Sequence, residues 1–324
     1  MRAWLVLGLL CIASVGSAAA QDAKDFPNRP VRIVVPFPAG GPTDINMRIL
    51  GQKLSEIWGQ GVVIENRPGA NTGIGAQMVA KAAPDGYTLL AAMDTTLVMN
   101  PATSTPMTYD PFKDFATITL TAKNTSLLTV RAEDGPKTVK ELIARGKAST
   151  TRLNFGAGII TTRLAGYQFA RAASIEVVMV PYKGSTEVVQ ALLTKSVDFI
   201  IDGVSSSLQL IRGGQFRALA KLNERPLSPL PDLPTLAAAS GLSELTDMSS
   251  WIGFVAPAGT PPSIVEKIHR DVVKVYADAA VAERLDKAGI NAVTLPPAEF
   301  DAFFRAEAAR WTKVYRELGI KLND

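Results

Sequence analysis

The sequence predicts an α/β protein with more than one lobe, and three observations support this prediction. Short apolar runs rich in β-forming residues alternate with segments whose apolar residues recur at helical spacing. Two polar, proline-punctuated stretches, 100–115 and 225–234, interrupt the alternation. The chain has 324 residues, of which 47% are hydrophobic, and this length exceeds what one hydrophobic core usually supports.

The first α/β unit contains three predicted strands. They are Val31–Val35, Val62–Glu65 and Tyr87–Ala92. The apolar residues between the first two strands have the spacing of a helix; they are Ile45, Ile49, Leu50, Leu54, Ile57 and Trp58. A strand, a helix and a second strand in this order imply parallel pairing.

The same alternation restarts after residues 100–115, which we expect to be a surface excursion rather than core. The predicted strands of this second unit are Leu127–Val130, Leu153–Phe155, Ile175–Val180, Asp198–Ile201 and Phe216–Leu222. Its predicted helices are Thr138–Lys147, Leu164–Ala172 and two segments near Glu187–Leu193 and near Leu208. Residues 225–234 close the unit.

Predicted helices dominate the last part of the chain, after a strand at Ser250–Ala256. Pro262–Tyr276 begins with prolines in its first turn, where a missing N–H is tolerated. Pro297–Leu318 is amphipathic, and its expected core anchors are Phe300, Phe303, Phe304 and Trp311.

Residues 1–20 have the pattern of a secretory signal peptide. Arg2 precedes an apolar run at 4–13, and small residues follow it. We therefore expect cleavage near residue 20 and an exported, soluble mature protein. The only cysteine, Cys11, lies in this segment, so the mature chain is expected to have no thiol. Lipid attachment at Cys11 is the alternative, and Leu10 disfavours it because a small residue normally precedes a lipidated cysteine.

The charge pattern argues against nucleic-acid binding. Without Arg2, 33 of the 34 basic residues remain against 30 acidic ones, which gives a net charge of +3. Lysines and arginines are dispersed, and no basic run is interleaved with aromatic residues. No cluster with metal-ligand spacing stands out, and no dinucleotide fingerprint or P-loop occurs, so we expect neither a metal nor a cofactor.

The sequence offers little for catalysis. His269 is the only histidine, and it lies among charged residues of a predicted amphipathic helix, where we expect a surface residue rather than a general base. GVSSS at 203–207 lacks the closing glycine of a nucleophile elbow. We therefore expect that the protein is not an enzyme.

Residues 36–44, PFPAGGPTD, join the first predicted strand to the helix that follows it. Paired glycines let a backbone approach a ligand closely, and a helix start presents unpaired N–H groups at its positive end. Thr43 can cap this helix, and Asp44 suits its dipole. The junction predicts a seat for a carboxylate or a phosphate; a plain tight turn with a helix cap is the equally weighted alternative.

A second junction has similar chemistry. NFGAGIITTR at 154–163 again leads from a strand through glycines and hydroxyl residues to a helical pattern. Ligands of parallel α/β sheets bind beyond the carboxyl ends of the strands, so we expect the two junctions to face each other. Two such helix starts across a cleft would clamp a small acid.

Several motifs also resemble those of a known family. They are PNRPVRIVVPFPAGGPTDI (27–45), ENRPGANTGIGA (65–76), AAPDGYTL (82–89), VPYKGS (180–185) and FVAPAGTPP (254–262). With these motifs in one order from about Phe26 to Lys321, the chain is similar to the tripartite tricarboxylate transporter substrate-binding proteins, the Bug family.

The resemblance implies a periplasmic binding protein of the type II fold, in which two crossover strands join two α/β lobes. It places the first lobe at 26–123 plus 247–324 and the second lobe at 124–246. The implied ligand is a small di-, tri- or aromatic carboxylic acid held between the lobes. The implied partners are the membrane subunits of a tripartite tricarboxylate transporter, and the receptor itself is expected to be a monomer.

The resemblance also implies the ligand contacts. The amides of Ala39, Gly40 and Gly41 are expected to face the carboxylate, and two threonines of the second junction to supply donors from the other lobe. Asp202 is expected to meet an amino or hydroxyl group of the ligand, or else to cap a neighbouring helix. The full implied set is Phe37, Ala39, Gly40, Gly41, Thr43, Asp44, Asp94, Thr95, Thr161, Thr162, Arg163 and Asp202.

Two positions depart from the family pattern. Arg163 stands where relatives commonly have a histidine, and Gly203 replaces a frequent asparagine. A cation in the first turn of a helix opposes the helix dipole, so Arg163 suggests a compensating anion such as the distal carboxylate of the ligand. The alternative is a solvated arginine on the surface of a lobe.

Two other functions are open at the level of the sequence. One is an exported enzyme that acts on an organic acid. The other is a ligand sensor whose closed form reports to a sensor kinase of a two-component system.

Overall fold

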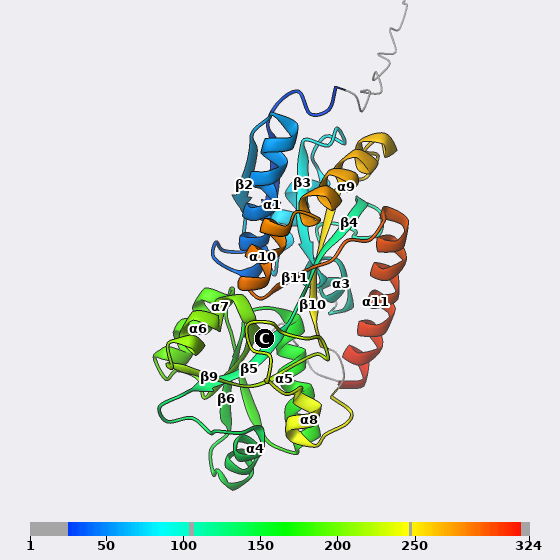
Figure 1. The fold of residues 1–324 in the computed structure, drawn as a ribbon. Helices are drawn as coiled ribbons and strands as arrows, with labels where there is room; N and C mark the ends of the chain where they lie inside the picture. Colours follow the sequence, from blue (N-terminus) through cyan, green and yellow to red (C-terminus); the bar gives the residue numbers. More distant parts are fainter. Residues whose placement is uncertain (1–24, 104–106, 246–247, 319–324) are drawn as a thin grey trace, which may run out of the picture.

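A computed structural model describes residues 25–103, 107–245 and 248–318. The chain forms two β-sheets, each flanked by helices, and the sheets lie one above the other in Figure 1. This arrangement confirms the predicted two-lobed α/β fold. The predicted signal peptide, with Cys11, lies outside the described residues.

The first lobe is built on a six-stranded sheet with the strand order β11-β4-β10-β3-β1-β2. Its strands are β1 (Val31–Val35), β2 (Val62–Asn66), β3 (Thr88–Met93), β4 (Phe115–Asn124), β10 (Ser250–Pro257) and β11 (Ile290–Ala292). As predicted, β1 pairs in parallel with β2, and it also pairs in parallel with β3. The remaining pairs are antiparallel, so the parallel strands form one half of this sheet.

The second lobe repeats the plan with the strand order β7-β6-β8-β5-β9. Its strands are β5 (Ser126–Arg131), β6 (Leu153–Ala157), β7 (Val177–Pro181), β8 (Phe199–Gly203) and β9 (Phe216–Lys221). β6 pairs in parallel with β7 and β8, whereas β5 pairs antiparallel with β8 and β9. Each lobe therefore has three parallel strands whose carboxyl ends lie at one edge.

Helices cover both faces of each sheet. In the first lobe, one face packs on α1 (Pro42–Trp58), α9 (Pro262–Tyr276) and α10 (Ala279–Lys287), and the other on α2 (Gly73–Ala80), the π-helix η1 (Thr95–Met99) and α11 (Pro297–Leu318). In the second lobe, one face packs on α4 (Val139–Ala148), α5 (Ile160–Ala173) and α8 (Leu236–Ser240), and the other on α6 (Ser185–Leu193) and α7 (Val204–Arg212). α3 (Asn100–Ala102) continues η1.

The chain crosses between the lobes twice. Thr125 alone separates β4 from β5, and the return runs from β9 to Ser250 at the start of β10. Asn223 joins the two crossings, since its Nδ2 donates to Thr125 Oγ1 at 3.0 Å and to Ser249 Oγ at 2.8 Å. From this path we propose the lobe boundaries expected from the sequence, 26–123 plus 247–324 and 124–246.

Several parts of the first lobe differ from the sequence predictions. The helix α2 and the π-helix η1 were not predicted. The expected surface excursion at 100–115 is partly buried, because Asn100 and Tyr109 lie in the interior. β4 was not predicted, although FATITLTAKN alternates apolar and polar residues as a half-buried strand does. The helix α10 and the short strand β11 in the last part of the chain were not predicted separately.

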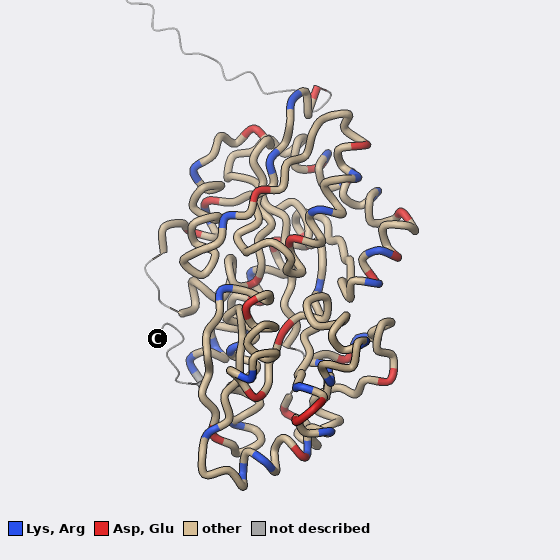
Figure 2. Tube along the Cα trace, turned by 90° about the vertical axis from the view of Figure 1, so that its left-hand side faces the viewer, with Lys and Arg blue, Asp and Glu red and all other residues tan. Residues whose placement is uncertain are grey.

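Charged residues of both signs are interspersed along the trace of both lobes, as Figure 2 shows. This distribution agrees with the dispersed charges of the sequence. Among the described residues, no helix has the length and hydropathy needed to cross a membrane.

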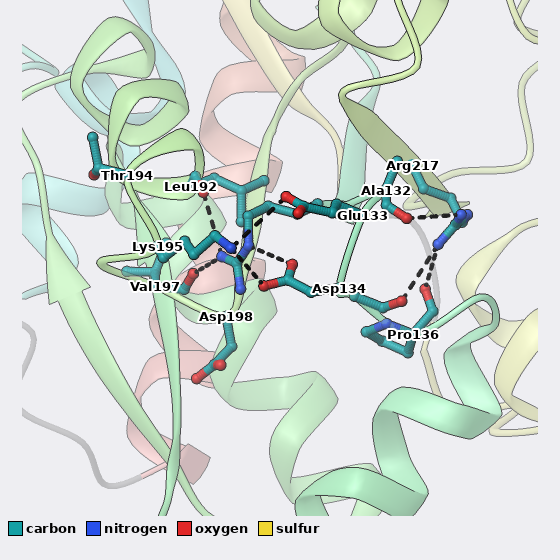
Figure 3. A network of polar contacts seen from close by, with 12 residues as sticks. Ala132, Glu133, Asp134, Pro136, Leu192, Thr194, Lys195, Val197, Asp198 and Arg217 are labelled. Atoms are coloured by element: carbon teal, nitrogen blue, oxygen red, sulfur yellow. Dashed lines mark hydrogen bonds and ion pairs between the residues drawn. The ribbon is translucent and has the colours of Figure 1, made fainter.

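A network of polar contacts stabilises the carboxyl end of β5, at Arg131 (Figure 3). Arg131 donates to Asp134 Oδ1 at 2.7 Å and to the carbonyl oxygen of Val197 at 2.7 Å. Arg217 donates to the carbonyl oxygen of Ala132 at 3.1 Å. Because Arg131 and Ser126 are the two ends of the same strand, the network holds the end of β5 opposite to the crossing and is structural.

Candidate functional site

A small cavity lies between the lobes where the parallel strands end. Its walls come from the segment after β1 and the end of β3 in the first lobe, and from the segments after β6 and β7 and the end of β8 in the second. Asn124, Ser126 and Ser250 of the two crossings complete the walls. The cavity encloses about 40 Å³, which is room for two or three water-sized groups and therefore for a group as small as a carboxylate.

Four helices begin at this cavity. Residues of the first turn or the N-cap of α1, α5, α6 and α7 line it, and none of these N-termini has a side-chain cap. By contrast, α4, α8 and α10 are capped by Thr138, Thr235 and Asp278 and do not begin at the cavity. A helix N-terminus carries about half a positive charge and has unpaired N–H groups. The site is therefore suited to an anion.

Two buried polar side chains of the cavity wall have atoms without a protein partner. Both Oδ1 and Nδ2 of Asn124 lack a hydrogen bond, although its side chain is only 3% exposed. Asp202 accepts a hydrogen bond from Ser185 Oγ at 2.8 Å through Oδ1, and its Oδ2 has no partner. Burial raises the pKa of Asp202 to about 6. Unpaired buried polar atoms are costly, so these groups are suited to a ligand that pairs with them.

The first junction lies where the sequence predicted, but its residues act differently. Phe37, Gly41 and Thr43 line the cavity, whereas Ala39, Gly40 and Asp44 do not. The amide of Gly40 donates to Asp44 Oδ2 at 2.9 Å, so the expectation that this amide faces the ligand is wrong for this structure.

Thr43 and Asp44 also have other roles than those expected. α1 begins at Pro42 with Gly41 as its N-cap, and the hydroxyl of Thr43 donates to the sulfur of Met93 at 3.1 Å instead of capping the helix. Asp44 also accepts from Arg48 Nε at 2.9 Å, and these hydrogen bonds hold its pKa below the ordinary value despite burial. Asp44 therefore stabilises the loop.

The second junction supplies two lining residues and one contact between the lobes. Ile159 and Thr162 line the cavity, and the hydroxyl of Thr162 donates to the carbonyl oxygen of Ile159 at 2.9 Å. Thr161 of the second lobe donates to Asp94 Oδ2 of the first lobe at 2.7 Å. Complete burial raises the pKa of Asp94 to about 7. Asp94 and Thr161 thus meet each other and not the cavity.

Thr95 and Arg163 lie at a second, larger cavity, and neither lines the first one. Arg163 is only 7% exposed, so the alternative of a solvated surface arginine is wrong. Its Nη2 donates to the carbonyl oxygen of Tyr182 at 3.2 Å, and its Nε has no partner. Apart from Ala39, Gly40 and Asp44, the predicted site residues are therefore divided between two cavities and the contact between the lobes.

The sequence analysis missed several residues of the first cavity. Asn124 is the last residue of β4, the strand that was not predicted, and recognition of the alternating pattern of β4 would have placed this side chain at the strand end. Gly184, Ser185 and Thr186 form the start of α6 after β7. This junction, VPYKGST, has the same order of strand, glycine and hydroxyl residues as the two junctions that were predicted.

Glycines allow the two lobes to approach closely at the cavity. A Cβ atom on Gly203 would lie 2.9 Å from Pro42 Cγ, and one on Gly184 would lie 3.3 Å from Pro38 Cδ. Both prolines belong to the first lobe and both glycines to the second. The glycine at position 203 therefore permits this approach.

Nothing in the geometry suggests a metal centre. Within the described ranges, no group of three or more His, Asp or Glu side chains is arranged to hold a metal ion. His269 lies on α9 outside both cavities and is half-buried, and burial lowers its pKa. The site therefore offers neutral donors and helix ends as its means of binding.

Comparison with known proteins agrees with this geometry. Residues 46–320 match the TctC family model, described as the tripartite tricarboxylate transporter family receptor. The protein BugT of Bordetella pertussis is 32% identical over 324 residues, which cover 99% of this chain and 98% of that relative.

Two solved structures share both sequence and fold. Rpa4515 of R. palustris with adipate is 33% identical, with a TM-score of 0.87 over 91% of this chain and 99% of that one. MatC from Rhodopseudomonas palustris with bound malate is 30% identical, with a TM-score of 0.80 over 89% and 99%. These relatives are binding proteins and not enzymes. The chain therefore belongs to the TctC family of tripartite tricarboxylate transporter receptors, which includes the Bug periplasmic binding proteins.

Proposed function

We propose that this protein is a periplasmic receptor that captures a small carboxylate, a di-, tri- or aromatic acid, between its lobes. It then delivers the acid to the membrane subunits of a tripartite tricarboxylate transporter. The observation that carries the proposal is the convergence of four helix N-termini without side-chain caps on one buried cavity. Anions are favoured at such helix ends.

The polar side chains of the cavity complement a carboxylate. Asn124 Nδ2 is free to donate to a carboxylate oxygen, and Oδ1 of the same amide is free to accept. Burial raises the pKa of Asp202 to about 6, so its neutral form is accessible near neutral pH and can donate to an anionic ligand. When Asp202 is ionised, its Oδ2 instead accepts from a hydroxyl or ammonium group of the ligand.

Binding is coupled to closure of the lobes. In the closed arrangement, Thr161 donates to Asp94, and Ile160 and Leu164 of α5 join the hydrophobic core formed around η1 of the first lobe. A ligand favours this state only through contacts that it lacks in the open one. An acid in the cavity touches both lobes and therefore favours closure.

The periplasmic location and the partner are inferred from the relatives. The sequence begins with the pattern of a secretory signal, and similar proteins are periplasmic binding proteins. Osmotic-shock extraction tests the location, and uptake of labelled acid into vesicles that contain the transporter subunits tests delivery. Protein found only in the cytosol, or uptake that does not depend on the receptor, would contradict these points. A sensor kinase as a further partner stays a prediction.

A thermal-shift screen of mono-, di-, tri- and aromatic carboxylates tests ligand capture. An acid that binds only the folded protein raises the free energy of unfolding by about 2.7 kcal/mol at a hundredfold excess over its Kd. We expect at least one acid of the panel to do so, and the matching neutral amide to have no effect. If no acid stabilises the protein, or if amides stabilise it equally, the proposal is wrong.

Asn124→Leu separates binding from folding. Leucine has the same number and branching of side-chain heavy atoms and removes two unpaired buried polar atoms, so the melting temperature of the ligand-free protein should stay the same or rise. The stabilisation by the acid should be lost. Thr129→Val is the matched control, because it removes a buried unpaired hydroxyl that lines neither cavity. If the acid stabilises Asn124→Leu as much as it stabilises the wild type, Asn124 does not contact the ligand.

Asp94 should make stability depend on pH. Its pKa rises from an ordinary 3.8 to about 7 on folding, so the folded protein binds this proton more tightly than the unfolded chain does. Its contribution is complete below pH 3.8, falls as the pH rises, and is lost above pH 7. Relative to wild type, Asp94→Asn should therefore gain stability as the pH rises through this window.

Melting temperatures of wild type and Asp94→Asn, measured side by side from pH 4 to pH 8, check this expectation. The titration of Asp202 is present in both proteins and cancels in the difference. A difference in melting temperature that is the same at every pH would contradict the expectation.

A further inference from the structure

The second cavity also lies between the lobes, and it is much larger than the first, at about 610 Å³. The first lobe contributes the loop after β2, residues 68–72, together with Phe37 and Thr95. The second lobe contributes residues that follow β6 and β7, among them Arg163 and Tyr182. Phe37 and Ile159 line both cavities, so the two spaces adjoin at this pair of apolar side chains.

Arg163 is a buried cation without an anionic partner. Its side chain lines the second cavity, and its guanidinium donates a hydrogen bond to the carbonyl oxygen of Tyr182. No carboxylate of the described residues pairs with it, and burial lowers its pKa. Burying a charge without a counterion is costly, and the first turn of α5 adds an unfavourable dipole. Both costs are reduced if an anion binds beside the guanidinium.

Other polar groups of the second cavity are compatible with an anion. The hydroxyl of Thr95 is buried without a partner, and it is free to donate. Lys183 and Glu187 also line the cavity, and both are exposed to solvent. Glu187 accepts from the backbone amide of Lys183 at 3.0 Å. With two cations and one carboxylate, the charge of the lining is positive.

The wall opposite Arg163 is held rigidly by a buried side chain. Residues Ala70, Asn71 and Thr72 all have positive φ, a conformation that is costly outside glycine. Asn100 stabilises this strained loop, since its Nδ2 donates to the carbonyl oxygen of Asn71 at 2.6 Å and to the hydroxyl of Tyr109 at 3.1 Å. The second cavity is therefore a built feature of the closed molecule.

We propose that the ligand is an extended diacid that occupies both cavities at once. This inference rests on the proposed function and narrows the ligand to one class. One carboxylate lies at the converging helix ends in the first cavity, where there is little room for anything more. An apolar spacer passes between Phe37 and Ile159, and the second carboxylate pairs with Arg163 in the second cavity. Arg163 is thus the residue that distinguishes diacids from monoacids.

Calorimetric titration with matched acids tests this proposal. The probes are the straight-chain diacids of four to eight carbons and the monoacids of the same lengths, for example adipate and hexanoate. The wild type should bind one of the diacids more tightly than its monoacid. In Arg163→Met, the affinity for that diacid should fall by about 30-fold or more, the effect of removing one partner of a buried charge pair, while the affinity for the monoacid should change less than about twofold.

Two further variants separate charge from packing. Arg163→Lys keeps the charge and loses the planar fork, so it should recover part of the preference for the diacid. Thr95→Val keeps the shape and removes the free hydroxyl, so it should weaken only the diacid. Thr95→Val also tests the second cavity independently if Arg163→Met does not fold, which circular dichroism would show.

The outcomes distinguish this inference from the proposed function. If wild type binds diacids and monoacids equally, or if the variants weaken both to the same extent, the second subsite is wrong while capture of a carboxylate stands. If wild type binds no acid at all, the proposed function itself is wrong. A preference for the diacid that disappears in Arg163→Met and partly returns in Arg163→Lys supports the proposal.

Discussion

The carboxyl ends of β1, β2 and β3 lie at one edge of the first sheet, and those of β6, β7 and β8 lie at an edge of the second. The two edges face each other across the cavities between the lobes. The helices α1, α5, α6 and α7 follow β1, β6, β7 and β8, so the N-termini of these four helices point at the same space. Four partial positive charges are thereby concentrated on one small cavity, and an anion is the species that relieves them.

In this arrangement, backbone N–H groups at the helix N-termini are the main donors of the site. Neutral donors and helix ends attract a carboxylate without the desolvation cost of burying several ionised side chains. The ionisable groups that are buried near the interface are either held by hydrogen bonds, as in Asp94 with Thr161, or left with free atoms, as in Asp202 and Arg163. The free atoms are the ones for which we propose ligand contacts.

The closed form depends on small residues as much as on polar ones. Gly203 and Gly184 let the second lobe approach Pro42 and Pro38 of the first lobe. Ile160 and Leu164 then extend the first-lobe core across the boundary. In the proposed closure, apolar burial, the hydrogen bond from Thr161 to Asp94 and the contacts of the ligand act together, and the ligand shifts the balance between open and closed states.

Local patterns in the sequence determined three elements to the residue and placed most of the others within a few residues. β1, α9 and α11 begin and end as predicted, because apolar spacing and proline positions are local signals. The two strand-to-helix junctions were also predicted, since glycines and hydroxyl residues mark them. Tertiary structure alone decided which groups the site presents: it paired Thr161 with Asp94, and it left Asn124 unpaired. The burial of Arg163 and the division into two cavities depend on contacts between segments far apart in the chain, and no local pattern encodes such contacts.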